Sequence, residues 1–551
     1  MPGWMIQAYN SVCIYIRSFN YHESTIIMAH TPQPLQSNTP TTDGTLTALD
    51  MKKTGSWILL ATILGSSMVF IDANVVNVAL PRIQTDLNMD ATSVQWVVEA
   101  YSLFLAALIL VGGSLGDRYG RKRIFAIGIT LFAVASMWCG LSPNGIQLIV
   151  ARAVQGVGGA FLTPGSLAII RALFPADRRG QAIGLWSGFS AITSALGPVL
   201  GGWLVQTASW RWVFFINVPL AVIVLLVLFW CVPENRDEQD NAPLDWIGAL
   251  LATLSLGGII YGLIESNNLG LSNSIVLGSV ALGLVALVAF IIVELRVKAP
   301  MMPLKLFRSR TFAGTNLLTL FLYAGLSGSF FFLPFDLIRT QGYPPTAAGA
   351  ALLPFTIIVF SLSRWSGGLI TRYGAKLPLV IGPTIAGIGF LLFTRPDIGG
   401  SYWTTFFPAV VVLGLGMSIT IAPLTTAVLN AVEDHYAGIA SGINNAVSRI
   451  AGLLAIAVLS IFVIQTFGNN LDNQLNALNV SPAIRQALDA QRTKLVGATV
   501  PSNVHGPLQA ELTRAIAESF VGGFRLAMFI GAGLAFASAI CALILVEGKR
   551  K

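Results

Sequence analysis

Long apolar stretches alternate with short polar ones along most of this chain. About 20 apolar residues in a row form a helix that crosses the bilayer core of about 30 Å. Strands of a membrane barrel would instead be short segments of alternating polarity. The pattern therefore predicts an all-α, polytopic membrane protein with fourteen transmembrane helices. They cover residues 57–80, 94–114, 123–141, 146–172, 181–206, 212–232, 246–264, 275–294, 312–338, 346–370, 378–394, 402–425, 437–466 and 520–547.

Composition supports a membrane location. Hydrophobic residues make up 54% of the 551 positions and charged residues only 11%, whereas soluble domains carry roughly 25% charged residues. A net charge of +8 would suggest a nucleic-acid partner in a soluble chain, but here Lys and Arg are expected to mark cytoplasmic helix ends. The four cysteines lack metal-ligand spacing. We therefore expect no nucleic acid, no metal and no cofactor.

The distribution of Lys and Arg predicts the orientation. Basic residues concentrate in alternate loops, while the intervening short loops hold mostly single cations. The positive-inside rule makes the basic loops cytoplasmic, and the even number of helices then places both termini on the same side. The basic loops contain Arg118, Arg121, Lys122, Arg123, Arg178, Arg179, Arg296, Lys298, Lys305, Arg308, Arg310, Arg372 and Lys376.

One loop motif occurs twice. The stretch "GGSLGDRYGRK" begins at Gly112, and "SGGLITRYGAK" begins 254 residues later at Ser366. The repeat predicts two homologous six-helix halves, with two extra helices inserted between them. The expected organisation is a cytoplasmic, disordered segment 1–56, a first half 57–232, a linker with the inserted helices 233–311, a second half 312–547 that includes an extracytoplasmic loop 467–519, and a cytoplasmic tail 548–551.

Four motifs together resemble the major facilitator superfamily, in its fourteen-helix drug:proton antiporter branch. They are the loop from Gly112, "RAVQGVGGA" from Arg152, "GPVLGG" from Gly197 and "DANVVNVALP" from Asp72. The resemblance extends from about Trp57 to Val546. It implies alternating access between two halves around a central substrate site.

The resemblance implies that the loop after the second helix latches the halves in the outward-facing state. A merely solvated basic loop would explain its cations equally well. Thr371 stands where the first copy of the loop has Asp117, so the acidic part of the latch is expected in the first half only. The latch candidates are Gly113, Asp117, Arg118, Gly120, Arg121 and Arg372.

The "GPVLGG" motif predicts a kink in the fifth helix. Proline removes one helical N–H and pushes the preceding turn away. In the resembled family this kink belongs to exporters, which gives the expected direction of transport. Its residues are Gly197, Pro198, Gly201 and Gly202.

Away from the helix ends, three charged residues lie inside predicted helices of the first half: Asp72, Glu99 and Arg152. A charge inside the membrane costs at least about 2.5 kcal/mol, so each should face a cavity or a partner. The resemblance favours proton coupling through Asp72 and Arg152. Structural pairing with another helix is the competing interpretation. Glu99, near the outer end of the second helix, is a further candidate for binding protons or cationic substrates.

Uncharged polar residues and one arginine suggest a substrate cavity. Asn74 replaces the threonine usual in its motif, and Arg449 is either a cavity residue or a charge at a cytoplasmic helix end. The cavity candidates are Asn74, Gln155, Asn444, Asn445 and Arg449.

Other charged residues are expected at solvated helix ends, namely Glu265, Asp336 and Arg339. The loop 467–519 is interpreted as a spacer rather than a helical cap over the exit. The segment 1–27 is interpreted as an upstream extension, with translation starting at Met28 or Met51, rather than as an interfacial helix.

The sequence therefore predicts a proton-coupled exporter of drugs or other lipophilic or cationic small molecules in the cytoplasmic membrane. The expected partners are the substrate, protons and membrane lipids, with a monomeric chain and an adaptor or outer-membrane partner left open. An exporter dedicated to one metabolite, lipid or siderophore, or a non-transporting sensor, is the alternative. Phosphate-binding and zinc-protease motifs are missing from the sequence, which argues against an enzyme.

Overall fold

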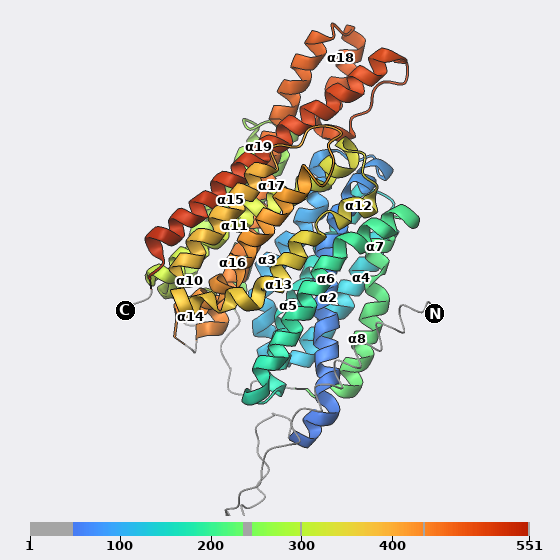
Figure 1. The fold of residues 1–551 in the computed structure, drawn as a ribbon. Helices are drawn as coiled ribbons and strands as arrows, with labels where there is room; N and C mark the ends of the chain where they lie inside the picture. The colour runs from blue at the N-terminus through green and yellow to red at the C-terminus, as the bar shows by residue number, and fades with distance from the viewer. Residues whose placement is uncertain (1–47, 235–244, 298–299, 434–435, 549–551) are drawn as a thin grey trace, which may run out of the picture.

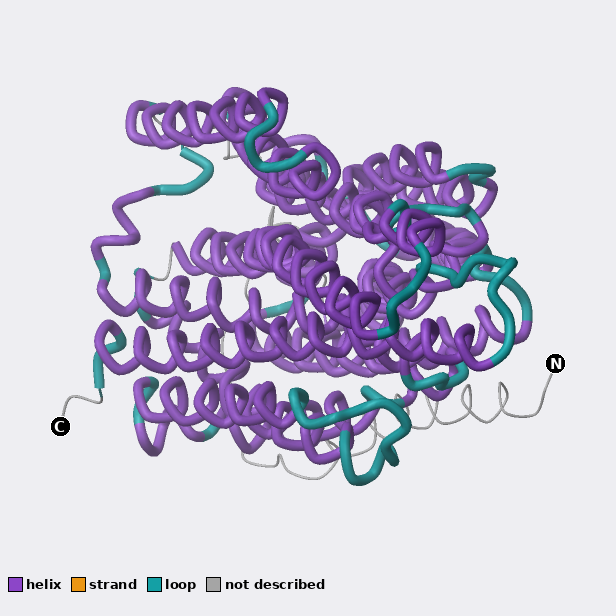
Figure 2. Tube along the Cα trace, turned by 90° about the horizontal axis from the view of Figure 1, so that it is seen from above, coloured by secondary structure: helices purple, strands orange, loops and turns teal. Residues whose placement is uncertain are grey.

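The computed structural model describes residues 48–234, 245–297, 300–433 and 436–548, and all the regular secondary structure in these ranges is helical (Figures 1 and 2). The first half consists of α2 (Ala48–Asp86), α3 (Ala91–Tyr119), α4 (Arg121–Leu141), α5 (Gly145–Leu173), α6 (Ala176–Thr207), α7 (Trp212–Phe215) and α8 (Asn217–Cys231). The inserted pair is α9 (Trp246–Leu269) and α10 (Ser274–Arg296).

The second half begins with α11 (Arg310–Phe335), which continues into a π-helical turn at Asp336–Thr340. The remaining α-helices are α12 (Pro345–Ala350), α13 (Leu353–Gly367), α14 (Leu369–Tyr373), α15 (Lys376–Leu392), α16 (Phe406–Asn430), α17 (Ala437–Ala477), α18 (Pro482–Asp489) and α19 (Pro507–Leu545). Short 3₁₀ turns occupy Leu304–Arg308 and Arg492–Gly497.

The predicted all-α membrane fold is confirmed. Thirteen helices in the described residues are long and apolar enough to cross a membrane, and the shorter apolar helix Lys376–Leu392 matches the eleventh predicted span. Apolar side chains cover the outside of the bundle as well as its core. In α10, for example, Leu277, Val285 and Leu295 are all more than half exposed, as expected for a helix that faces lipid.

Close helix packing depends on glycines in this fold. A β-carbon on Gly112 would lie 2.2 Å from the carbonyl oxygen of Ala160, and one on Gly156 would lie 2.3 Å from that of Tyr101. These two contacts bring α3 and α5 to backbone distance. Small residues commonly allow such contacts between membrane helices, where no hydrophobic driving force favours association.

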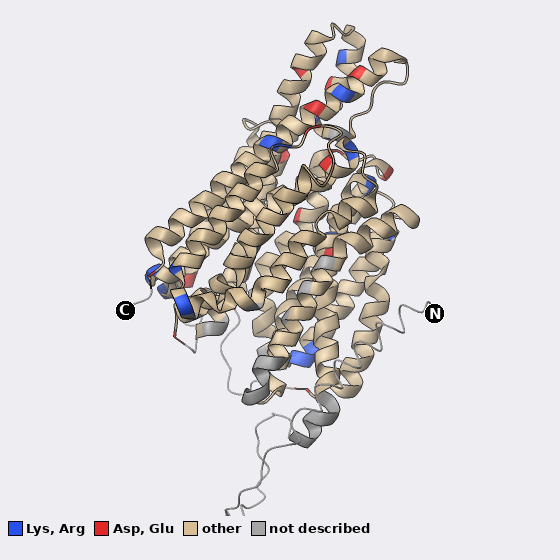
Figure 3. Cartoon of the chain, in the orientation of Figure 1, with Lys and Arg blue, Asp and Glu red and all other residues tan. Residues whose placement is uncertain are grey.

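The two ends of the bundle differ in charge and structure. We call the end that carries α18 the cap end, and the end that carries the turns at Gly120 and Gly374 the basic end. Figure 3 shows Lys, Arg, Asp and Glu positions gathered at these ends, with few along the helices between them. This separation is what a bilayer demands, because charges inside it are costly.

The two halves meet at the cap end. A β-carbon on Gly202 of α6 would lie 2.2 Å from the Pro345 carbonyl oxygen, and one on Gly349 of α12 would lie 2.0 Å from that of Pro198. Toward the basic end the two groups of helices diverge (Figure 1). There, β-carbons on Gly184 of α6 and Gly367 of α13 would meet nothing within 4 Å. The structure is thus closed at the cap end.

The loop predicted at 467–519 is largely helical, which corrects the boundaries of two spans. Helix α17 continues to Ala477 and α19 begins at Pro507. Apolar side chains at helical spacing explain the extension, because Leu471, Leu475 and Leu512 are buried in this hairpin. The remaining connection, with α18, forms a cap that projects beyond the bundle (Figure 1).

The cap contacts the other half of the molecule. Lys494 donates from Nζ to Asn88 Oδ1 at 3.1 Å, and Gln84 donates to the Lys494 carbonyl at 3.3 Å. Both partners lie at the turn between α2 and α3. The cap is therefore more than a connection between α17 and α19.

Candidate functional site

The centre of the first half contains a buried ion pair. Arg152 of α5 donates from Nη1 to Asp72 Oδ2 of α2 at 2.5 Å, and the two side chains are 1% and 0% exposed. Gln155, one turn further along α5, donates to Asp72 Oδ1 at 2.9 Å and accepts from Arg152 Nη1 at 2.8 Å. The structure therefore brings together three of the residues predicted from the sequence.

Two residues not predicted from the sequence complete this network. Ser136 of α4 accepts hydrogen bonds from Gln155 Nε2 at 3.3 Å and from Asn217 Nδ2 at 3.0 Å. Its own hydroxyl donates to the Phe214 carbonyl at 2.8 Å. Asn217 also approaches Asp72 Oδ1, at 3.4 Å. Helices α2, α4, α5 and α8 of the first half thus contribute to one polar network.

The guanidinium of Arg152 is held on its other sides as well. Its Nε donates to the Val97 carbonyl of α3 at 3.0 Å, and its central carbon lies 4.1 Å from the centre of the Tyr101 ring. Stacking on an aromatic face suits the planar, weakly hydrated guanidinium. Desolvating two charges costs several kcal/mol each, and only good geometry with further hydrogen bonds offsets that cost. This network provides both.

Glu99 of α3 is a fully buried carboxyl group outside this network. Neither of its carboxylate oxygens has a hydrogen-bond partner among the residues that the structure describes. Leu103, one turn further along the same face, belongs to a buried apolar cluster with Leu453 of α17 in the second half and Ile260 of α9. Glu99 is therefore enclosed by protein, on the side of α3 that faces the other half.

The predicted cavity residues are not gathered into one cluster. Asn74 donates to the Ser194 hydroxyl of α6 at 3.1 Å, and Asn444 donates to the Thr319 hydroxyl of α11 at 2.8 Å, each within its own half. Asn445 is exposed and donates to the Ser441 carbonyl. Arg449 is partly buried on α17, a helix that packs against α3.

The two copies of the loop motif have the same geometry. Gly120 and Gly374 adopt φ angles of +105° and +76°, which favour glycine, and each N–H closes the end of the preceding helix. The preceding arginines, Arg118 and Arg372, each stack over the next tyrosine ring. The side chain of Asp117 lies outside the described residues.

Glu234, after the end of α8, supports the first loop but not the second. Its carboxylate accepts from the Lys122 backbone N–H at 3.1 Å and lies 3.5 Å from Arg123 Nε. A β-carbon on Gly120 would lie 2.6 Å from it. Of the loop glycines, Gly112 makes the closest helix contact, whereas a β-carbon on Gly113 would meet only the Pro164 side chain, at 3.7 Å.

The glycines of the "GPVLGG" motif face two neighbours. β-Carbons on Gly197 and Gly201 would lie 2.9 Å from Asn74 Cβ and 2.8 Å from the Val75 carbonyl oxygen of α2. Gly202 and Pro198 instead contact α12 of the second half. The motif therefore packs one side of α6 on its own half and the other side on the opposite half.

Three residues predicted at solvated helix ends have protein partners or are buried. Asp336 is 1% exposed, in the π-helical turn that ends α11, so its predicted solvation is wrong. Arg339 keeps contact with solvent but donates from Nη2 to the Pro81 carbonyl at 2.8 Å and to the Thr85 hydroxyl at 3.2 Å, both in α2. Glu265 accepts from Trp96 Nε1 of α3 at 3.1 Å. Neighbouring helices, which the sequence does not place, account for all three.

A groove of about 410 Å³ marks the cap end of the junction between the halves. It is lined by Val78, Pro81, Arg82, Thr85, Asp86, Val205, Gln206, Ile338, Arg339 and Pro345, and Asp72 is not among these residues. Across the junction Thr346 donates to Gln206 at 2.6 Å. Within the described ranges, no group of acidic, histidine or cysteine side chains is arranged to bind a metal ion.

Sequence comparison identifies relatives of this chain. Residues 62–456 match the family described as Major Facilitator Superfamily. The Tetracenomycin C resistance and export protein of Streptomyces glaucescens is 32% identical over 88% of this chain and 90% of its own length. The Puromycin resistance protein pur8 of Streptomyces alboniger is 34% identical over 82% of this chain and 86% of its own. Multidrug resistance protein Stp of Mycobacterium tuberculosis (strain CDC 1551 / Oshkosh) is 32% identical over 91% and 92%.

Solved structures share the fold. A bacterial homolog of the human lysosomal transporter Spinster, in an inward-facing and occupied conformation, superposes with a TM-score of 0.62 at 15% identity and covers 89% of this chain and 97% of its own. A D-xylose-proton symporter superposes with a TM-score of 0.54 at 14% identity, covering 90% and 98%. These likenesses concern the fold alone.

Proposed function

This chain belongs to the major facilitator superfamily of membrane transporters, and from that premise we propose that it exports lipophilic or cationic small molecules in exchange for protons. Relatives named for drug resistance and export over nearly their whole length support this proposal. The family and these relatives are transporters, which agrees with the expectation that the chain is not an enzyme.

The single observation that carries the proton-coupling role is the buried network around Asp72. Arg152 stays charged at all relevant pH values, so the proton-binding partner of the pair is the carboxylate. When Asp72 takes up a proton, it loses its charge and its attraction for Arg152. The guanidinium must then find new partners, and the packing of α2 against α5 changes. Proton binding would thereby be linked to movement within the first half.

Glu99 is proposed as a second carboxylate in the transport cycle. An ionised carboxylate with no hydrogen-bond partner is costly to bury. We therefore infer that Glu99 carries a proton in this structure, in which the cap end is closed. A cationic substrate between the halves would provide the missing counter-charge and displace that proton. The position of Glu99 on the face of α3 that packs against α17 and α9 suits this exchange.

The substrate pathway is proposed to run between the halves, past Asn74, Asn445 and Arg449. Asn445 is exposed on α17, and Gln155 links the pathway to the proton site through its bond to Asp72. Asn444 is proposed to brace α17 on α11 at the edge of this pathway, because its amide is already engaged by Thr319.

The direction and switching of transport are assigned to two motifs. Gly197, Pro198, Gly201 and Gly202 let α6 move against α2 and α12, and we propose that they set the exporter direction. The loop around Gly113, Asp117, Arg118, Gly120 and Arg121, with Arg372 in its second copy, is proposed to hold the basic end closed when the cap end is open. In the present structure the two halves diverge at the basic end (Figure 1).

The membrane topology is proposed from the positive-inside rule. The basic end then faces the cytoplasm with both chain termini, and the cap end faces outward, so the structure is inward-facing. The chain is proposed to act as a monomer in the cytoplasmic (inner) membrane. An adaptor or outer-membrane partner would have the cap as its accessible surface.

A dedicated exporter is the second candidate function. Several relatives are named after one compound, such as tetracenomycin C and puromycin. Purified protein in vesicles with a pH-sensitive dye inside distinguishes the two. Proton movement on adding any of several cationic dyes and antibiotics supports a multidrug antiporter, whereas a response to one compound alone supports a dedicated exporter. No response to any compound, with orientation and folding verified, would count against both.

A further inference from the structure

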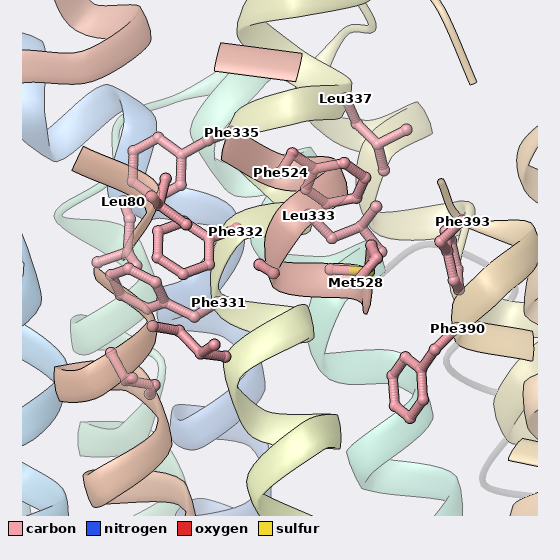
Figure 4. Close-up of a cluster of buried hydrophobic side chains, with 14 of the residues drawn as sticks. Leu80, Phe331, Phe332, Leu333, Phe335, Leu337, Phe390, Phe393, Phe524 and Met528 are labelled. Atoms are coloured by element: carbon pink, nitrogen blue, oxygen red, sulfur yellow. The ribbon is translucent and has the colours of Figure 1, made fainter. Parts of the chain in front are cut away.

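The π-helical turn at the end of α11 contains a buried carboxyl group that has no role in the network around Asp72. Asp336 is 1% exposed, and within the described part of the chain its Oδ1 has no hydrogen-bond partner. Its sequence neighbours Phe335 and Leu337 are also buried. Figure 4 shows them among Phe331, Phe332 and Phe524, a layer of apolar side chains beneath the cap end. An ionised carboxylate is unfavourable in such surroundings.

The same turn holds the junction between the halves closed. Arg339, three residues after Asp336, donates to the Pro81 carbonyl and the Thr85 hydroxyl of α2. Leu80 of α2 lies beside Phe332 and Phe335 in Figure 4. Separation of the halves would therefore remove Arg339 from its acceptors and lift α2 off the apolar layer, so that water reaches the turn.

The neighbouring elements offer Asp336 one cation. Arg525 of α19 acts on it electrostatically, and Tyr343 of the following loop is the other ionisable neighbour. The polar side chains of Thr340 and Gln341 also act on the carboxyl group from the turn itself. Helix α12 has no ionisable residue. Lys494 of the segment Arg492–Gly497 donates to Asn88 instead.

Arg525 is only partly engaged in the closed state. Its Nη2 donates to the Pro396 carbonyl at 2.9 Å and lies 3.6 Å from Asp397, which is itself exposed. Its Nε is buried, and no described residue forms a hydrogen bond with it. Asp336 thus has a buried acceptor without a partner, and Arg525, which acts on it electrostatically, has a buried donor without one, among the described residues.

We propose that Asp336 is a second proton-binding site, separate from Asp72, which controls closure of the cap end. Asp336 is protonated when the cap end is closed. When the halves separate, it releases the proton to the water that enters from the outer side, and the carboxylate pairs with Arg525. Closure reverses both events. The proton exchanges with one side only, so it regulates closure without being transported.

The sign of the pH effect follows directly. The closed state binds one proton more than the open state at this site, so acid favours closure and alkaline solution favours opening. The proposal rests on the alternating access proposed above but requires no substrate and no proton transport. Failure of the exporter function and failure of this inference can therefore be distinguished.

The test uses the full-length protein in lipid nanodiscs with spin labels on cysteines at Ala208 and Ala347, two exposed positions on opposite sides of the junction. Native cysteines are replaced, and Asp72→Asn and Glu99→Gln are present throughout to remove the titration of the central carboxyls. Pulsed electron paramagnetic resonance gives the fraction of closed molecules at pH 5 to 9, for this parent and for Asp336→Asn, Asp336→Glu and Arg525→Gln.

The parent and Asp336→Glu should open as the pH rises, and Asp336→Asn should stay closed throughout. Arg525→Gln should move the opening midpoint upward by at least about one pH unit, because the carboxylate loses its cation. The proposal is wrong if the parent does not respond to pH, or if Asp336→Asn opens over the same range as the parent. Should the Asn variant not fold, an unshifted midpoint in Arg525→Gln would overturn it.

Discussion

Arg152 Nη1 lies 2.5 Å from Asp72 Oδ2, with both side chains sealed from solvent. The other polar side chains that contact this carboxylate, Gln155 and Asn217, also come from the first half of the chain. The second half has no copy of this network at its centre in the described residues. The two halves therefore share a fold but not this charged network.

Asp72→Asn should reduce drug-driven proton exchange to background while leaving expression intact. The amide keeps an acceptor for Arg152 but cannot take up a proton. Exchange is measured in vesicles with a pH-sensitive dye. Asp86→Asn is the matched control, since Asp86 lies on the same helix and only forms an exposed pair with Arg82. Normal exchange in Asp72→Asn would remove this residue from the coupling mechanism.

Ser136→Ala should destabilise the first half. Its hydroxyl accepts hydrogen bonds from Gln155 and Asn217 and donates one to the Phe214 carbonyl. Leaving these buried polar partners unsatisfied costs about 1–3 kcal/mol. Thermal unfolding of the detergent-solubilised protein should occur at a lower temperature. Ser142→Ala, which removes a single bond to the Trp138 carbonyl, should have a clearly smaller effect. Equal effects would mean that the network adds nothing to stability.

Gly349→Ala should hold the cap end open. The added β-carbon would lie 2.0 Å from the Pro198 carbonyl oxygen, which cannot move aside without moving α6. A cysteine at Val78, buried in the groove, should then react faster with an impermeant maleimide from the outside. Gly367→Ala is the control, because its β-carbon would meet nothing within 4 Å. Similar rates in the two variants would contradict the contact.

Arg118→Ala should slow transport without weakening substrate binding, and Asp117→Asn should do the same, if the first loop is a latch. Arg372→Ala is the internal comparison. It occupies the equivalent turn, but Thr371 precedes it and Glu234 supports only the first loop. Turnover and binding are measured separately, in vesicles and by ligand-induced fluorescence. Unchanged turnover in Arg118→Ala would reduce the first loop to a signal for topology.

A cysteine at Ser502 should be labelled from outside intact cells, and one at Gly548 only after the membrane is permeabilised. Both positions are exposed, Ser502 in the cap and Gly548 after α19 at the basic end. The opposite labelling pattern would invert the proposed orientation, and with it the direction assigned to export.

The positions of the membrane helices were predictable because their signal is local. Each span needs only its own run of apolar residues, and even the short α15 has one. The extension of α17 past Phe467 was missed because Asn and Asp dominate that stretch, whereas Leu471 and Leu475 form a buried stripe within it. Helical spacing of those leucines was the signal that could have shown it.

Contacts within the site were harder to predict because they join residues far apart in the chain. Asp72 and Arg152 attracted attention as charges in apolar runs. Ser136 and Asn217 are single uncharged residues in such runs, and nothing local distinguishes them from others. Asp336 was expected to be solvated because it lies at a helix end. Its burial depends on α19 and α2, which the sequence cannot place.

The seam at Gly202 and Gly349 has a consequence for energy conservation. At both glycines the opposing helices touch through backbone atoms, and such close packing leaves no room for a file of water molecules. Protons cross membranes readily along files of hydrogen-bonded water. Backbone-to-backbone packing at these two points thus limits the leakage of protons across the membrane. While the cap end is closed, the protein therefore does not dissipate the proton gradient on which the rest of the cell depends.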